Sequence, residues 1–521
     1  MPMRPHLFIG LFLVVLAFLA CTVPANHTEA EDAYEYARRV EQESGQMLFH
    51  PHHLLYLPLA QGVYHLLQAA GYAGRALPVL IGISVLCGAL SVSLFAAWLA
   101  RKRGLAAALP FSLGLLFSYG FWRYACEAEI YTPALCVAVA VFWILHQPWT
   151  ANRRILAVSL ISAFGICIHV LNVIPLLGGV ALFYWVSRKR RQAFAHILLT
   201  SSLVALVYLV AANTAGLYVP PADTQPLEGG LSFAMFAKGA VGFAQAVVSG
   251  NFLFICPDFQ QQIQTLFPYR MFAEEIYMGS RVSMGSFYAA LGTSLLGAAG
   301  ILLLLLDVVR RRFRDCWPVE WTASLAAALF WLVGLSGAVL LFEPGNPEMW
   351  VMALLPLWWC AALLLERLPR LLQRLLLVIA LLLGLHNWVG GMALIQSRSG
   401  DYSVQKTRWL LSRATKDTLI VTAESHVYIS YLNYWTDAEI MDLNYAGPSK
   451  KTLAKIREWH GPVYVLSEVF SPLPALVARF PDSKERLAQV ADALRLNSVK
   501  VHEDEAGCIY QYSRQMPLPF Q

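Results

Sequence analysis

The sequence predicts a polytopic α-helical membrane protein with about eleven spans and a small C-terminal α/β domain. Hydrophobic residues make up 57% of the 521 residues and charged residues only 14%, whereas a soluble domain averages about 25% charged residues. Apolar stretches recur that reach the roughly 20 residues needed to cross a bilayer. Basic residues cluster between these stretches, as is typical of cytoplasmic loops. Together these observations indicate a membrane protein with many crossings.

The net charge of +6 does not indicate a nucleic-acid partner, because the basic residues are spread over short clusters instead of one face. The nine cysteines include no CxxC pair, so the sequence predicts no structural zinc framework.

Runs without Asp, Glu, Lys or Arg mark the predicted spans. These runs are 5–28, 76–100, 104–122, 130–152, 155–187, 193–213, 286–306, 321–342, 349–365 and 375–395. The run 155–187 is too long for one span and has basic clusters at both ends. We therefore expect it to cross twice, with an outer turn near His169, Asn172 and Pro175.

Keeping every basic cluster inside places the N-terminus in the cytoplasm and two loops, 26–75 and 214–285, outside. We expect residues 1–397 to form the transmembrane module and 398–521 an extracytoplasmic domain, in a bacterial inner membrane. Within the second loop, the apolar segment 231–255 contains Lys238, which predicts a re-entrant or interfacial element and leaves open which of the two it is.

The C-terminal part changes in character. Residues 417–423, 461–470 and 505–514 read as strands, and 449–459 and 482–496 as amphipathic helices. This pattern predicts an α/β domain, and the domain contains no glycine-rich phosphate loop.

The first outer loop concentrates ionisable residues, and Asp32 is its strongest candidate for chemistry. If the surrounding segment is helical, Asp32, Glu35 and Tyr36 share one face. Arg38 and Arg39 can pair with these acids or hold a phosphate. The alternative is that the acids are simply solvated.

Three histidines follow in the same loop: His50, His52 and His53. Their spacing matches no known metal-ligand pattern, so we expect them at a lipid headgroup instead of a metal.

Glu127 and Glu129 lie within one turn of the fourth span. Acids at such positions are costly and usually have a function, although pairing with Arg123 is an alternative. His169 and Asn172 can contribute to the site or form a structural hydrogen bond in the turn.

The outer turn "EPGNPEMW" contains Asn346 and Glu348, and it is either a helix boundary or part of the same cavity. We expect Asp32, Glu129, His53 and His169 to line one pocket near the edge of the bilayer. The Asp32 and Glu129 carboxylates should lie within about one helix diameter, roughly 10–12 Å.

The order of motifs resembles the GT-C superfamily of membrane glycosyltransferases, in its protein O-mannosyltransferase-like and aminoarabinose-transferase-like branch. The resemblance rests on "D-x-x-x-Y" from Asp32 followed by "HP", then "FWRYACEAEIY" and "GICIHVLNVIP", and covers about residues 1–400. The loop departs from the mannosyltransferases, since Glu31-Asp32 replaces their Asp-Glu pair.

This resemblance implies sugar transfer from a polyprenyl-phosphate donor to an acceptor hydroxyl of a protein, lipid or glycan. It implies Asp32 as the general base and Glu129 as the second acid. A phosphate-reading motif is missing from the third outer loop, which leaves Lys238, Arg270 and Arg281 as candidates. One carboxylate suffices for inverting displacement. No cofactor is required, although a Mg or Mn ion between Asp32 and Glu129 is an alternative.

Two other function classes fit a polytopic protein. A transporter or lipid flippase would favour ionisable residues at the centre of the membrane and an internal repeat, and the sequence has neither feature. A non-catalytic assembly partner in glycan export would not need both Asp32 and Glu129.

Overall fold

The computed structural model describes residues 5–30, 32–218, 232–310, 323–365, 369–445 and 447–513. The chain forms two compact units. Unit 1 comprises Met1–Pro24, Arg39–Phe252 and Ser283–Gln396, and unit 2 comprises Ala25–Arg38, Leu253–Val282 and Ser397–Gln521. Glu31 and most of the basic cluster 310–314 lie outside the described residues.

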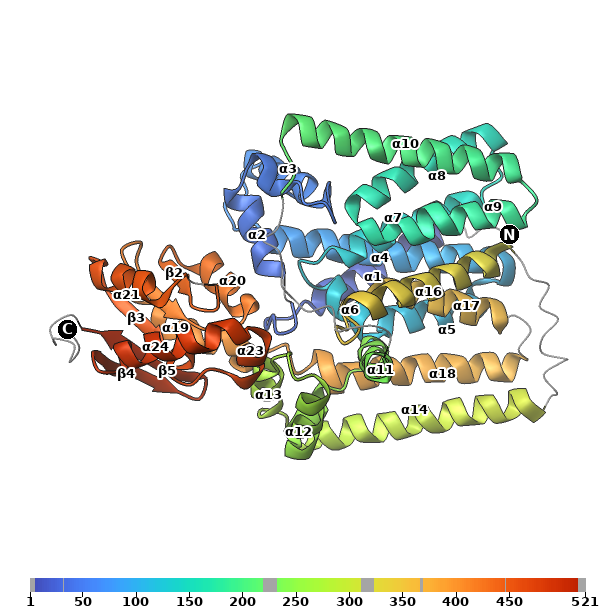
Figure 1. Cartoon of the computed structure of the whole chain (residues 1–521). Helices are drawn as coiled ribbons and strands as arrows, with labels where there is room; N and C mark the ends of the chain where they lie inside the picture. Colours follow the sequence, from blue (N-terminus) through green and yellow to red (C-terminus); the bar gives the residue numbers. More distant parts are fainter. Residues whose placement is uncertain are drawn as a thin grey trace. The chain divides into compact units, whose positions relative to one another are not determined.

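Unit 1 is helical, and its long helices run with nearly parallel axes in Figure 1. Its helices are α1 (Pro5–Cys21), α3 (Tyr56–Ala69), α4 (Leu77–Arg103), α5 (Leu105–Phe117), α6 (Tyr119–Ala125), α7 (Tyr131–Leu145), α8 (Ala151–Ile168), α9 (Val180–Val186), α10 (Arg190–Thr214), α11 (Phe233–Val247), α14 (Met284–Arg310), α16 (Ala323–Phe342), α17 (Val351–Leu364) and α18 (Arg370–Asn387). Helix α2 (Ala33–Gln42) crosses the boundary between the units.

Among the described residues, six helices are long and apolar enough to cross a membrane, or seven if the bent pair α5 and α6 counts as one span. This supports a helical membrane protein. Each of the predicted runs contains helix, but several of these helices are shorter than a full span. The count of eleven spans therefore stays a prediction.

Burial separates the central helices of unit 1 from its periphery. Helix α4 packs against α1, α5 and α7, and 67% of its apolar window is buried. The corresponding share for α10 and for α14 is only 17%. Because large apolar side chains on α10 and α14 stay exposed, these two helices suit contact with lipid tails.

Two breaks in the helices create the irregular backbone around the candidate site. Helices α5 and α6 meet at a bend of 67°. Helix α8 ends at Ile168, His169 is extended, and the chain resumes in a 3₁₀ turn (Val170–Asn172) and a π-helix (Val173–Gly179) before α9. The second break falls where the sequence predicts a turn in the run 155–187.

Unit 2 contains a five-stranded sheet of order β2-β1-β3-β5-β4. Its strands are β1 (Leu419–Thr422), β2 (Glu439–Asp442), β3 (Val463–Leu466), β4 (Ser498–Asp504) and β5 (Gly507–Tyr512). Strand β1 is parallel to β2 and β3, whereas β5 is antiparallel to β3 and β4. The alternation of strands and helices along the chain produces this parallel arrangement.

Alternate residues of the strands pack against helices on both faces of the sheet. Leu419 and Val421 join a core with α21 (Ser449–Glu458) and α24 (Lys484–Arg495). Ile420, between them, faces α19 (Tyr402–Leu411) and α20 (His426–Trp435). This alternation follows from the two-residue period of a strand.

Two segments from distant parts of the chain pack on this sheet domain within unit 2. The Tyr34 ring lies 4.9 Å from that of Tyr431 on α20. The ring of Tyr277, on α13 (Ala273–Gly279), lies 5.7 Å from that of Tyr402 on α19. Unit 2 therefore combines residues of the first and second predicted outer loops with the C-terminal part.

Candidate functional site

Three charged side chains are buried in unit 1 on α6 and in the turn between α6 and α7. Arg123 and Glu127 form an ion pair in which Nη1 and Oε1 are 2.6 Å apart, and neither side chain is exposed. Glu129 is also fully buried, and its carbonyl accepts a hydrogen bond of 2.9 Å from the Ser84 hydroxyl. The ion pair matches the alternative in which Glu127 is neutralised by Arg123. Glu129 is therefore the better candidate of the two acids for chemistry.

A second buried acid reaches Glu129 from the turn between α16 and α17. Glu348 is 2% exposed, and a carboxylate oxygen of Glu348 lies within 4.8 Å of one of Glu129. Asn346 shapes this turn, since its Oδ1 accepts a hydrogen bond of 3.0 Å from the Glu348 N–H. Two carboxylates this close favour a shared proton or a bound cation.

The break after α8 lies beside the same region of unit 1. The His169 ring is 5.4 Å from that of Tyr131, the first residue of α7. Asn172 donates through Nδ2 to the carbonyls of Ala134 and Gly165, at 3.1 and 2.9 Å. Asn172 thus ties the break to α7 and α8, which agrees with the structural alternative for this residue.

The three histidines of the first loop lie together in unit 1. The His50 ring stacks on the His53 ring at 4.2 Å between centroids, and it lies 5.1 Å from the His52 ring. His53 is buried, whereas His52 is exposed. The loop therefore concentrates imidazoles at a point that is accessible from the surface of the unit.

Asp32 precedes α2 in unit 2 and is partly buried. The Tyr36 hydroxyl donates to its Oδ2 at 2.8 Å, which places these two side chains together as the helical spacing predicts. Glu35 instead bonds to Nε2 of His426, the first residue of α20, at 2.9 Å. Ligand atoms of Asp32, Glu35 and His426 all lie within 4.8 Å of one another. A carboxylate and imidazole set of this kind can hold a divalent metal ion.

Asp32 belongs to unit 2 and Glu129 to unit 1. The predicted convergence of their carboxylates, and of the pocket with His53 and His169, therefore stays a prediction.

The three cationic candidates for the phosphate lie in different settings. In unit 2, Nη2 of Arg270 lies 3.4 Å from Glu275, and Nη2 of Arg281 lies 2.7 Å from Glu505. Lys238 is buried on α11 in unit 1. Because both arginines already bond to acids, a phosphate would have to compete with these carboxylates. Their role in phosphate binding stays a prediction.

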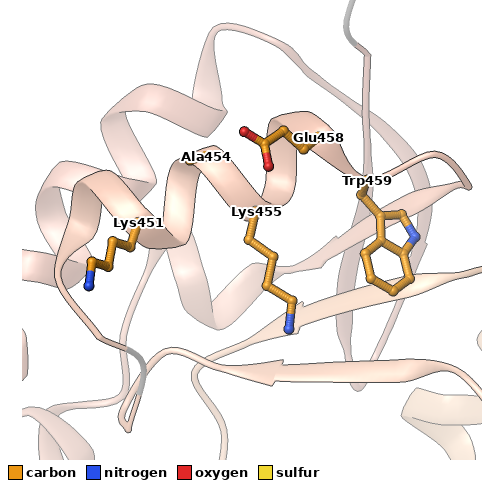
Figure 2. A pocket seen from close by; sticks show the side chains of 5 residues that line it. All are labelled: Lys451, Ala454, Lys455, Glu458 and Trp459. Carbon is orange, nitrogen blue, oxygen red and sulfur yellow. The ribbon is translucent and has the colours of Figure 1, made fainter.

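A shallow groove on unit 2 lies along α21. Figure 2 shows Lys451, Lys455 and Trp459 on one side of this helix. Lys455 bonds to Glu439 at 3.0 Å, and the Trp459 indole N–H donates to the Asp417 carbonyl at 2.7 Å. The groove contains none of the residues that the sequence predicts for the site.

Sequence reasoning missed two contacts of the candidate residues. His426 bonds to Glu35, and its position beyond the carboxyl end of β1 was a usable signal, because ligand groups gather at such ends. The ring of Tyr218 lies 4.5 Å below the Arg39 guanidinium. No spacing in the sequence links Tyr218 to the first loop.

No protein-family model and no curated protein matches the chain. Solved structures do match. ArnT from Cupriavidus metallidurans bound to undecaprenyl phosphate aligns with 12% identity and a TM-score of 0.55, over 98% of this chain and 98% of that one. The Archaeoglobus fulgidus oligosaccharyltransferase in complex with Zn and sulfate aligns with 13% identity and a TM-score of 0.47, over 96% and 73%. The arabinofuranosyltransferase AftD from Mycobacteria aligns with 14% identity and a TM-score of 0.48, over 98% and 40%.

The likeness to ArnT shows the fold. The resemblance to the GT-C superfamily, which the motifs predict, is confirmed at the level of the fold.

Proposed function

We propose that this chain is a glycosyltransferase that moves a sugar from a polyprenyl-phosphate donor to an acceptor hydroxyl on the outer face of the membrane. The observation that carries the proposal is the buried pair Glu129 and Glu348 in an apolar helical unit. Burying two like charges is costly, so such acids usually serve function. The fold supports the same conclusion, since the ArnT structure of that fold is bound to undecaprenyl phosphate.

The chain segments that make up unit 2 support the proposed topology. Its three segments, Ala25–Arg38, Leu253–Val282 and Ser397–Gln521, all come from parts of the chain that the charge bias places outside. A topology that put any of them in the cytoplasm would conflict with their packing in one unit. We therefore retain eleven spans, a cytoplasmic N-terminus and an extracytoplasmic C-terminal part in a bacterial inner membrane.

In the proposed reaction, Asp32 is the general base. The acceptor oxygen forms a bond to the anomeric carbon, and its proton passes to the Asp32 carboxylate. The bond from that carbon to the phosphate oxygen breaks, and the phosphate leaves with the electron pair. A single displacement of this kind inverts the configuration of the sugar. Tyr36 orients the base, because its hydroxyl donates to Oδ2 of Asp32.

Glu129 and Glu348 position the reacting groups in this proposal. Asn346 fixes the backbone of Glu348 by accepting its N–H. The pair also fits a divalent metal ion, since two carboxylate oxygens within 4.8 Å can converge on one cation. Such an ion would stabilise the negative charge of the phosphate.

The test is to purify the chain in detergent and incubate it with a panel of polyprenyl-phosphate sugars. We expect release of the lipid phosphate from at least one donor when an acceptor is present. A chain that moves lipid phosphates across vesicles but releases none would instead be the transporter or flippase.

The role of Asp32 is tested by Asp32→Asn, which keeps the size and polarity but cannot accept the proton. We expect turnover to fall by about 10²–10⁴-fold, the typical contribution of general-base catalysis. Glu31→Gln is the matched control and should stay active, since Glu31 is the adjacent acid in the sequence. If Glu31→Gln is inactive and Asp32→Asn is active, the general base is Glu31 and not Asp32.

A further inference from the structure

Four imidazoles and one guanidinium gather in unit 1, and they come from three segments of the chain. His50, His52 and His53 belong to the first loop, and His169 follows α8. Arg39 lies on α2, with its guanidinium over the ring of Tyr218, which follows α10. The Tyr218 ring is also 5.7 Å from the His50 ring. We call His50, His52, His53, His169 and Arg39 the histidine cluster.

Backbone hydrogen bonds join the histidine segment of the first loop to the chain at the end of α8 and to Tyr218. The Leu55 N–H donates to the Cys167 carbonyl, and the Val170 N–H donates to the His52 carbonyl, both at 2.8 Å. The Tyr218 N–H donates to the Phe49 carbonyl at 3.0 Å. The imidazoles are therefore placed by paired backbone and are preorganised for a ligand.

Two of the rings have their tautomer fixed by local bonds. The His52 N–H donates to Nδ1 of His50, and the Leu171 N–H donates to Nδ1 of His169, both at 3.1 Å. A neutral imidazole that accepts at Nδ1 must carry its proton at Nε2. Each neutral ring therefore carries a donor at Nε2–H, and Arg39 adds a permanent positive charge.

The cluster is crowded with groups that repel further positive charge. Burial lowers the pKa of His53 well below its usual range, and His50, His169, His52 and Arg39 lower it further. An anion among these groups would offset this repulsion, because its negative charge favours nearby positive charge.

A metal ion fits the cluster less well. Among the described residues, the acid and histidine groups whose ligand atoms could converge on a metal include no histidine of this cluster. The donors of the cluster thus point to an anion as the ligand.

We propose that the histidine cluster binds a phosphate monoester, with Arg39 and the Nε2–H groups of His50 and His169 donating to its oxygens. This inference rests on the proposed function, in which the departing lipid phosphate gains a second negative charge when its bond to the sugar breaks. A site that holds the dianion more tightly than the donor's monoanion favours this departure.

Binding to the full-length chain in phosphatidylcholine nanodiscs tests the proposal, with undecaprenyl phosphate, inorganic phosphate and undecaprenol as probes. We expect the lipid phosphate to bind and undecaprenol not to bind. Binding of inorganic phosphate would support the same site and assign it to free phosphate. His50→Ala should weaken phosphate binding by about 10-fold or more, as expected for a lost charge-assisted bond.

His53→Gln is a milder variant that keeps a polar side chain, and His65→Gln is the matched control on the exposed face of α3. His53→Gln should also weaken phosphate binding, because the His53 ring stacks on the His50 ring, whereas His65→Gln should leave it unchanged. Unchanged affinity in both cluster variants would overturn the proposal.

The binding readout keeps this inference separate from the proposed function. A chain that transfers sugar while the cluster variants bind phosphate normally would contradict the cluster alone. A chain that binds lipid phosphate through the cluster but transfers no sugar would contradict the proposed function alone.

Discussion

Unit 1 and unit 2 each bury several charged side chains, but they balance the charges differently. In unit 2, the Lys406 ammonium bonds to the carboxylates of both Glu424 and Glu468, and all three are buried. In unit 1, Arg123 is matched with Glu127, whereas Glu129 and Glu348 bring two carboxylates within 4.8 Å. This difference indicates a structural role for the Lys406 cluster of unit 2 and a functional role for the acid pair of unit 1.

The Lys406 cluster of unit 2 lies beyond the carboxyl ends of two parallel strands. Glu424 and Glu468 follow the parallel neighbours β1 and β3, and carboxyl ends of parallel strands meet at one edge. Burial raises the pKa of Glu468, and Glu424 raises it further. Burial alone would lower the pKa of Lys406, but the two carboxylates more than offset this and raise it. The lysine therefore stays charged and joins α19 to both strands.

The largest effect is expected from Lys406→Met, which leaves two buried carboxylates facing each other. Breaking a buried ion pair typically destabilises by about 3–5 kcal/mol. Hydrogen exchange of β1 and β3 in the full-length protein should speed up accordingly.

Lys455→Met is the control for this change, because Lys455 and Glu439 form an exposed pair with 50% and 48% of the side-chain surface accessible. An exposed pair contributes about 0–1 kcal/mol, so exchange should barely change. Equal effects of the two substitutions would remove the structural role that we assign to Lys406.

Glu127→Gln should also destabilise, because it removes the charge that faces the fully buried Arg123 guanidinium. We expect a loss of about 3 kcal/mol, at the lower end for a buried pair, since glutamine can still accept a hydrogen bond. Thermal unfolding in detergent measures the loss. A Glu127→Gln protein with normal stability but no turnover would show that Glu127 acts in the reaction and does not stabilise the fold.

The smallest effect is expected at Asp442, at the end of β2. Burial raises its pKa from 3.8 to about 6. The folded state therefore binds this proton more tightly, so stability from Asp442 is present below about pH 4 and is lost as the pH rises through about 6. Asp442→Asn should stabilise the sheet at pH 8, where Asp442 is charged, and have no effect at pH 4, where it is protonated. We expect only about 1 kcal/mol at pH 8, because solvent screens a partly exposed group. Stabilisation that does not change with pH would exclude this origin.

Much of the fold was predictable because it depends on local pattern. Apolar runs and basic clusters predict the helices of unit 1, and the strands at 417–423 and 505–514 appear as β1 and β5. The predicted strand 461–470 is shorter in the structure, since β3 ends at Leu466 and Ser467–Phe470 is helical.

Helix α20 was not predicted, because its aromatic and β-branched residues favour a strand. Ser425 decides the outcome locally, since its side chain accepts the Tyr428 N–H and caps the helix. Strand β2 was not predicted either, because its four residues are too few to show an alternating hydrophobic pattern.

The candidate site was less predictable, because its contacts join residues that are far apart in the chain. Glu129 and Glu348 were both candidates, but no spacing brings them together. The same is true of His426 and Glu35, or of Arg39 and Tyr218. Sequence reasoning can identify ionisable residues at the ends of spans, and tertiary packing decides which of them meet.

The most direct test of this account is the single-turnover release of lipid phosphate by Glu129→Gln, measured beside its thermal stability. Glutamine keeps the size of the side chain but removes one charge of the acid pair. The account predicts turnover lower by about 10²-fold or more, with stability equal to or above that of the wild type. Wild-type turnover by a stable Glu129→Gln protein would contradict the account, because the acid pair would then have no part in the chemistry.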